Sequence, residues 1–307
     1  MQLPGRAVGV IAAIFALACS VDDPVDERAV ETNTDAPLIY SVNYPLAYFA
    51  QRVGGEDVRV VFPAPPNTDP AEWAPAPNEI AAFQTADLIL LNGPGHAGWV
   101  QRASLPKSKI VDTSISFRDR LIELRGETKH THGPAGAHVH AGTARTTWLD
   151  PLLAIEQARA ITDALVRIRP ERATSFLERF ADLEADLLQL DTRFTEAAEA
   201  IDEAPILFSH PVYQYFERRY RLNGESVHWE PDESPSPIMW QKLSSILSDH
   251  PSQLMIWEAA PGEETIRRLD SLGISSIVIP PCANTPEEGD WYSAMLESAA
   301  HMKKAGS

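Results

Sequence analysis

The sequence has little cysteine and no run of basic residues. Its 307 residues include two cysteines, Cys19 and Cys282, and 26 Lys and Arg against 43 Asp and Glu, for a formal net charge of −17. Two cysteines cannot build a framework of several disulfides. A surface this acidic repels phosphate backbones, which argues against nucleic acid as a partner, whereas diffusing cations are attracted to it.

Sequence motifs of common hydrolases and nucleotide-binding enzymes are missing. The chain contains no G-x-S-x-G, no phosphate-binding G-x-x-x-x-G-K-[ST] and no H-E-x-x-H. Neighbouring pairs such as Ser209 and His210 arise readily by chance, and adjacency in sequence does not orient a base toward a nucleophile. We therefore expect a protein that is not an enzyme.

Long apolar runs are scarce, and the apolar segment Ala7–Ala18 is too short to span a bilayer as a permanent helix. With Arg6 before it and small residues after it, residues 1–18 are typical of an export signal peptide. The segment Ala16-Leu17-Ala18-Cys19 resembles a bacterial lipobox, which predicts that Cys19 carries a lipid anchor and that 19–36 is an acidic tether. The alternative is a plain secretory signal. Cys282 is expected to be a small buried residue.

The rest of the chain alternates between strand and helix patterns. This alternation predicts βα units on parallel sheets in two α/β lobes, residues 37–150 and 204–307. Between them, residues 151–203 have apolar side chains at helical spacing, with a break at Pro170. The second of these linker helices would be roughly 45 Å long at about 1.5 Å per residue, enough to brace both lobes.

A loop at residues 127–143 is unusually rich in histidine. It contains His130, His132, His138 and His140, four of the nine histidines in the chain. Its Gly, Pro and Ala neighbours favour turns. Such a loop can supply imidazole ligands to a metal ion.

Several segments in order resemble the metal-binding subunits of bacterial ABC importers, the ZnuA/TroA-like zinc and manganese family. These segments are YPLAYFAQRVGG, the Asp69-Pro70 loop, ADLILLNGPGHAGWV, TTWLDP, SHPVYQYFERRYRL and GDWYSAM. The resemblance covers nearly the whole chain after the tether. It implies two α/β lobes with a metal cleft between them, a long helix that limits lobe closure, and delivery of the ion to a membrane permease without chemical turnover.

The chain departs from the family at three of its usual ligand positions. Ala71 stands where a His follows the Asp-Pro pair, and Thr146 stands where a His precedes the Trp by two residues. Pro280 and Pro281 stand where a carboxylate often follows the last strand. His210 alone matches a family ligand, and one histidine cannot hold zinc tightly.

We predict that one or both of His138 and His140, which lie six to eight residues before Thr146, replace the missing second ligand. The alternative is a surface loop that only gathers ions weakly. His130 and His132, which lie further from Thr146, are assigned to that weaker role.

Other candidate ligands are the residues that follow predicted strands. His210 and Glu258 each follow an apolar strand, where open α/β sheets place their ligand sites. Glu72 could supply an oxygen ligand beside the lost histidine, and Glu230 is a weaker candidate of the same kind as Glu258. The alternatives are a hydrogen-bonded histidine at a helix start for His210, and a cap or an arginine partner for Glu258.

Four polar residues receive structural interpretations. His96, His250 and His301 have no partners in sequence and are interpreted as surface residues. Asp150 is expected to be the N-cap of the linker helices.

The sequence thus predicts an exported solute-binding lipoprotein, facing the periplasm or the cell surface, that delivers a transition metal to an ABC permease. Zn²⁺ is favoured over Mn²⁺ because imidazole-rich sites suit zinc, and a monomer is expected. Rival hypotheses are a periplasmic metallochaperone or metal buffer without a permease, a zinc-dependent hydrolase, and a family member that has lost its metal and binds something else.

Overall fold

A computed structural model describes Met1 and residues 35–93, 95–124, 129–132, 136–139 and 142–307. The chain divides into two units, Met1–Thr34 and Asp35–Ser307. The predictions for the signal peptide, Cys19, most of the tether and His140 therefore lie outside the described residues. Among the described helices, none is both long and apolar enough to cross a membrane.

The second unit contains two four-stranded parallel sheets. The first has the strand order β2-β1-β3-β4 and the second has the order β10-β9-β11-β12. Their strands are β1 (Leu38–Ser41), β2 (Arg59–Val61), β3 (Leu88–Leu91), β4 (Ile110–Asp112), β9 (Pro205–Phe208), β10 (Asn223–Ser226), β11 (Leu254–Trp257) and β12 (Ser275–Val278). In both sheets the chain reverses its direction of winding beside the first strand, between β1 and β3 and between β9 and β11, and such switch points are where α/β sheets bind ligands.

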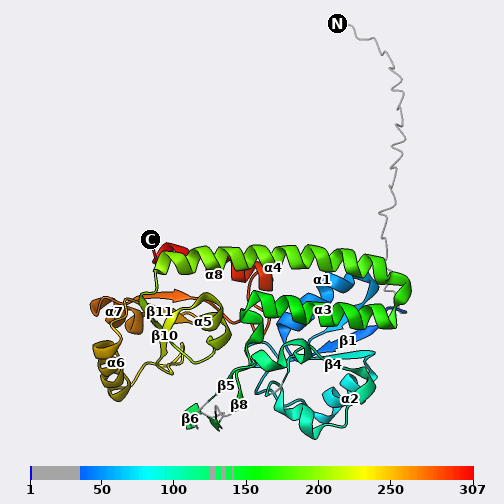
Figure 1. Ribbon diagram of the computed structural model, residues 1–307, viewed down its shortest axis with the longest axis horizontal. Coiled ribbons are helices and arrows are strands. Elements are labelled where there is room, and N and C mark those ends of the chain that lie inside the picture. Colours follow the sequence, from blue (N-terminus) through cyan, green and yellow to red (C-terminus); the bar gives the residue numbers. More distant parts are fainter. Residues whose placement is uncertain (2–34, 94, 125–128, 133–135, 140–141) are drawn as a thin grey trace. The chain divides into compact units, whose positions relative to one another are not determined.

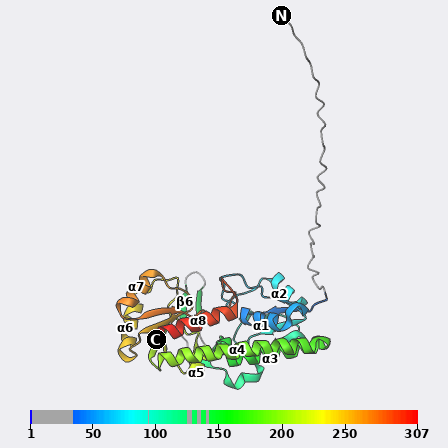
Figure 2. The ribbon, with the colours of Figure 1, turned by 90° about the horizontal axis from the view of Figure 1, so that it is seen from above.

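Helices connect the strands and cover the sheets (Figure 1). They are α1 (Tyr44–Gly54), α2 (Pro77–Thr85), α3 (Pro151–Ile168), α4 (Ala173–Ile201), α5 (Gln214–Tyr220), α6 (Pro237–Asp249), α7 (Glu263–Ser271) and α8 (Trp291–Ala305). The long helix α4 packs along α3, α1 and α8, as the view in Figure 2 also shows. The prediction of two parallel α/β sheets joined by a long helix is confirmed.

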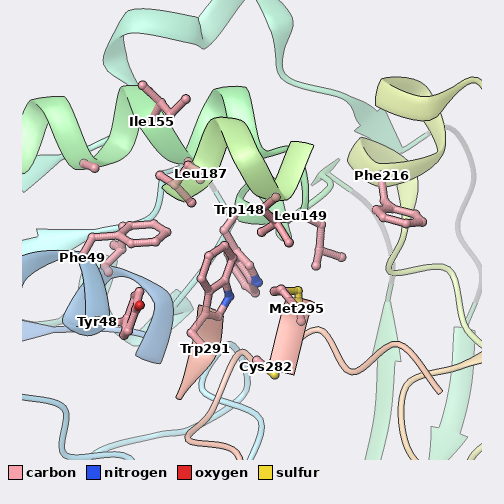
Figure 3. Close-up of a cluster of buried hydrophobic side chains, with 14 of the residues drawn as sticks. Tyr48, Phe49, Trp148, Leu149, Ile155, Leu187, Phe216, Cys282, Trp291 and Met295 are labelled. Atoms are coloured by element: carbon pink, nitrogen blue, oxygen red, sulfur yellow. The ribbon is translucent and has the colours of Figure 1, made fainter. Parts of the chain in front are cut away.

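Helix α8 follows the second sheet in sequence but completes the core around α1 (Figure 3). The Trp291 ring lies 5.2 Å from the ring of Phe49 and 5.9 Å from that of Tyr48, measured between centroids. Trp148 is 1% exposed in the same cluster, and its Nε1 donates a hydrogen bond of 2.7 Å to the Pro281 carbonyl. Each such side chain stabilises the fold by roughly 1.5–3 kcal/mol when fully buried.

Two local predictions from the sequence are confirmed. The Asp150 side chain caps α3 by accepting a hydrogen bond of 3.0 Å from the Leu152 N–H. Cys282 is buried, and burial raises the pKa of its thiol to about 12. Pro170 opens a short 3₁₀ turn, Pro170–Arg172, before α4 begins.

Other local predictions are wrong because burial depends on segments far away in sequence. His96 is buried rather than on the surface, since the aromatic ring of Trp148 packs against it. His250 is partly buried, and its Nε2 lies 3.0 Å from the Ile206 carbonyl oxygen.

Candidate metal centre

His210 lies at the carboxyl end of the second sheet, two residues after β9. Strand β9 is buried between β10 and β11, so the residues that follow it emerge at the switch point of the sheet. The Ser209 N–H bonds to the Ile256 carbonyl and the Trp229 N–H to the Ser209 carbonyl, at 2.8 and 2.6 Å. These bonds hold the turn that carries His210, whose side chain is 9% exposed.

Two glutamates converge on this imidazole from the neighbouring strands. Glu258 follows β11 directly, and its Oε1 lies 3.2 Å from Nδ1 of His210. Glu230 follows β10 by four residues, and its Oε1 lies 3.3 Å from the same nitrogen. The three residues offer ligand atoms that all lie within 4.8 Å of one another, the only such group among the described residues. Ligand atoms around a tetrahedral zinc ion lie roughly 3.3 Å apart, so a small contraction suffices for coordination.

The charges around His210 favour a cation. Burial lowers the pKa of the imidazole, but the hydrogen bond and charge of Glu258, with the charges of Glu230 and Asp69, outweigh burial and raise the pKa above its usual value. The two carboxylates that stabilise the protonated imidazole would also stabilise a metal ion bound to it. A metal must therefore displace a proton from His210 to bind.

The first sheet contributes an ion pair close to the two family ligand positions that are altered here. Arg145, next to Thr146, forms a salt bridge with Glu72, next to Ala71. The Arg145 carbonyl is held by Nδ2 of Asn92 at 2.7 Å, and Asn92 follows β3 in a buried polar network. Glu72 therefore meets a guanidinium group, a partner that its place in the sequence does not reveal.

Asp69 lies on the loop of residues 62–76 between β2 and α2, hereafter the 62–76 loop. Asp69 is exposed to solvent, and its Oδ1 accepts a hydrogen bond of 2.9 Å from the Ala71 N–H. The surrounding protein raises the pKa of Asp69, and the negative charges of Glu72 and Glu258 raise it further. The sequence identifies Asp69 only as part of the Asp-Pro pair, not as a site residue.

His96 follows β3 at the carboxyl end of the first sheet. Its side chain is buried, and its ring lies 5.9 Å from the ring of Trp148 in an edge-on arrangement. Neither ring nitrogen has a hydrogen-bond partner among the described residues. Burial, with a smaller contribution from Arg145, lowers the pKa of His96 to about 3, so the imidazole is neutral.

The loop after β3 also has the spacing G-x-G-x-x-G, with Gly93, Gly95 and Gly98. In dinucleotide-binding domains this pattern opens a helix whose N-terminus holds a pyrophosphate. Here a short 3₁₀ turn, Gly98–Arg102, follows instead, and Gly93 packs against Ser114, where an added Cβ would lie 2.4 Å from Oγ. Gly93 therefore serves close packing, and no α-helix follows the described residues of this loop to offer its N-terminus to a phosphate.

The histidine-rich segment forms a hairpin in which β6 (Lys129–His132) pairs antiparallel with β7 (Gly136–Val139). The register places His130 opposite His138. The side chain of His138 and all of His140 lie outside the described residues, so their role as replacement ligands stays a prediction. The segments on either side of the hairpin form a second small sheet, in which β5 (Glu123–Leu124) pairs antiparallel with β8 (Gly142–Thr143).

Known proteins resemble the chain over most of its length. Residues 39–305 match the family model described as ZnuA, zinc-uptake complex component A, periplasmic. The high-affinity zinc uptake system protein ZnuA of Bacillus subtilis is 24% identical over 252 residues, which cover 81% of this chain and 79% of the relative. The manganese-binding lipoprotein MntA of Halalkalibacterium halodurans is 23% identical over 223 residues, 72% of this chain and 68% of the relative.

The fold also occurs among solved structures. The Zn(II)-bound ZnuA-like domain of Streptococcus pneumoniae AdcA superposes with a TM-score of 0.74 at 20% identity, over 87% of this chain and 98% of that domain. The family model spans most of the chain, and the two parallel sheets with their long helix agree with it. The chain therefore belongs to the ZnuA family of solute-binding proteins.

Proposed function

We propose that the chain is the metal-capturing component of an ABC importer, with Zn²⁺ as the favoured cargo. The observation that carries this proposal is the convergence of His210, Glu230 and Glu258, with ligand atoms within 4.8 Å of one another at the switch point of the second sheet. One imidazole nitrogen and two carboxylate oxygens are ligands that zinc accepts. The zinc and manganese named in two relatives, ZnuA and MntA, support a divalent transition metal.

Three ligands leave coordination positions to be filled. His138 and His140 remain the predicted replacements for the ligand missing at Thr146, because the hairpin is joined to that position by a short segment. Glu72 remains a candidate oxygen ligand, but it must exchange Arg145 for the ion. Breaking this ion pair costs little free energy, since exposed pairs contribute about 0–1 kcal/mol.

The mixed donor set affects the choice of metal. Imidazole favours zinc, whereas carboxylate oxygens suit manganese better than imidazole does. Two of the three converging ligands are carboxylates, so we expect zinc to bind more tightly than manganese but by a smaller factor than at a site built from imidazoles.

The remaining parts of the proposal concern location and partners. The protein is exported and carries a lipid on Cys19, so it faces the periplasm or the cell surface as a monomer. It hands the ion to a membrane permease and performs no catalysis. The periplasmic description of the family and the lipoprotein MntA support this location.

Metal analysis of protein purified without chelator tests the proposal, followed by calorimetric titration of stripped protein with zinc. We expect one tightly bound ion. His210→Ala should weaken its binding about tenfold or more, because it removes the central ligand, whereas His301→Ala, an exposed histidine on α8, should not. Equal zinc affinity in both variants would contradict the proposed site.

A further inference from the structure

The 62–76 loop carries two carboxylates that have different partners. Glu72 forms a salt bridge with Arg145, which holds it on the side of the first sheet. Asp69, three residues earlier, uses Oδ1 to accept the Ala71 N–H at 2.9 Å, and its Oδ2 makes no hydrogen bond to the described residues. Of the two carboxylates, Asp69 has the oxygen that can coordinate an ion without breaking an ion pair.

The loop is tied to the second half of the chain next to Asp69. Nδ2 of Asn284, which follows β12, donates hydrogen bonds of 2.8 Å to the carbonyl oxygens of Pro65 and Thr68. Thr68 is the immediate neighbour of Asp69. The backbone carbonyl of Asp69 accepts the N–H groups of Glu72 and Trp73, at 3.1 and 2.9 Å, so the turn that presents the carboxylate is well defined.

Asp69 interacts electrostatically with the converging ligands. The charge of Asp69 acts on His210, and the charge of Glu258 acts on Asp69. Glu230 and Glu258 place two carboxylates beside the imidazole, and Asp69 adds a third negative charge that helps to raise the pKa of His210. Carboxylates that crowd one another in this way are relieved by a cation among them.

We infer that Asp69 supplies the metal ligand from the first half of the chain, in place of the histidine that is absent at Ala71. This inference rests on the proposed function. Asp69 is not among the residues whose ligand atoms already lie within 4.8 Å of one another. Binding of the ion therefore draws the Asp69 carboxylate toward His210 and closes the 62–76 loop onto the second sheet. Asp69 thus adds one oxygen ligand to the converging group, and His138 or His140 remains the predicted ligand for the position altered at Thr146.

The test compares Asp69→Asn with Glu72→Gln, two changes on one loop that each remove one negative charge and keep the side-chain size. Zinc and manganese affinities are measured with chelator-stripped protein by competition with a chromophoric chelator. We expect Asp69→Asn to weaken zinc binding at least tenfold and Glu72→Gln by less than about threefold. Asp69→Glu, which keeps a carboxylate, should recover part of the loss. Urea unfolding of each variant checks that the fold is intact.

The outcomes separate this inference from the proposed function. If the wild type binds one zinc ion and His210→Ala weakens it, while Asp69→Asn and Glu72→Gln behave alike, the role of Asp69 is refuted and the metal site stands. If Glu72→Gln shows the larger loss, Glu72 is the ligand and the inference is wrong. If the wild type binds no metal tightly, the proposed function fails first. Zinc X-ray absorption gives an independent check, because loss of Asp69 should lower the number of oxygen neighbours.

Discussion

The buried histidine His96 should make the protein sensitive to mild acid. In the folded protein burial lowers its pKa to about 3, whereas an exposed histidine in the unfolded chain titrates near 6.5. Acidification therefore protonates the unfolded chain first and favours unfolding. The contribution of His96 to stability is complete above pH 6.5 and is lost as the pH falls toward 3.

The size of the effect follows from the two pKa values. A difference of about 3.5 units corresponds to about 5 kcal/mol once both states are protonated. Between pH 7 and pH 5 the loss is about 2 kcal/mol, because the folded state is still neutral and the unfolded chain is mostly charged. His96→Leu replaces the imidazole with an apolar side chain of comparable size that cannot take up a proton. We expect this variant to lose about 2 kcal/mol less than the wild type over the same range.

Urea unfolding at pH 7 and pH 5, followed by tryptophan fluorescence and circular dichroism with a chelator present, measures the difference. Other titrating groups, among them His210, contribute equally to both proteins and cancel in the comparison. His301→Gln, on the exposed face of α8, controls for loss of a histidine as such. If wild type and His96→Leu lose the same stability between the two pH values with unchanged denaturant slopes, the reasoning is refuted.

Three further predictions concern the site and its frame. Zinc affinity should fall about tenfold per pH unit below the raised pKa of His210, since each ion displaces one proton; a flat profile from pH 8 to pH 6 in chelator competition would exclude His210 as a ligand. His138→Ala combined with His140→Ala should weaken zinc binding in calorimetry about tenfold, and unchanged affinity would leave the loop without a role in the tight site. Asp150→Ala should lower the free energy of unfolding in urea by about 1–2 kcal/mol, because it removes the cap on the Leu152 N–H. Asp150→Asn keeps an acceptor and should lower the free energy of unfolding by less. Equal losses in the two variants would mean that charge, not capping, matters there.

The fold could be predicted because its signals are local and repeat along the chain. Short apolar strands between amphipathic helices indicated parallel sheets, and the uninterrupted helical spacing after Pro170 indicated the long helix α4. Asp150 was predictable as a cap, since capping involves residues only two or three positions apart. Each of these features depends on neighbours within a few turns of chain.

The site was predicted only in part because it is assembled from distant segments. His210 and Glu258 could be found from their positions after apolar strands, and the structure brings them together. Glu230 was given less weight than Glu258, yet its carboxylate lies about as near Nδ1 of His210, because the residues after β10, which ends at Ser226, return to the imidazole. The partner of Glu72 lies 73 residues further along the chain, and no local pattern reveals such a pairing.

The burial of His96 illustrates the same limit. A histidine between glycines and alanines is typical of an exposed loop. The ring that covers it belongs to Trp148, a residue of the TTWLDP segment. Only the folding of that segment against the first sheet determines the environment of His96.

The packing of α8 against α1 has a consequence for the order of events during synthesis. The ribosome makes Phe49 near the beginning and Trp291 near the end, yet the two rings meet in one cluster. Until residues 291–305 have emerged, the core around α1 is incomplete. Its apolar side chains stay exposed and accessible to chaperones or proteases. The amino-terminal half should therefore complete its folding only after the last helix has been synthesised. A chain truncated before Trp291 should be degraded rather than accumulate in a partly folded form.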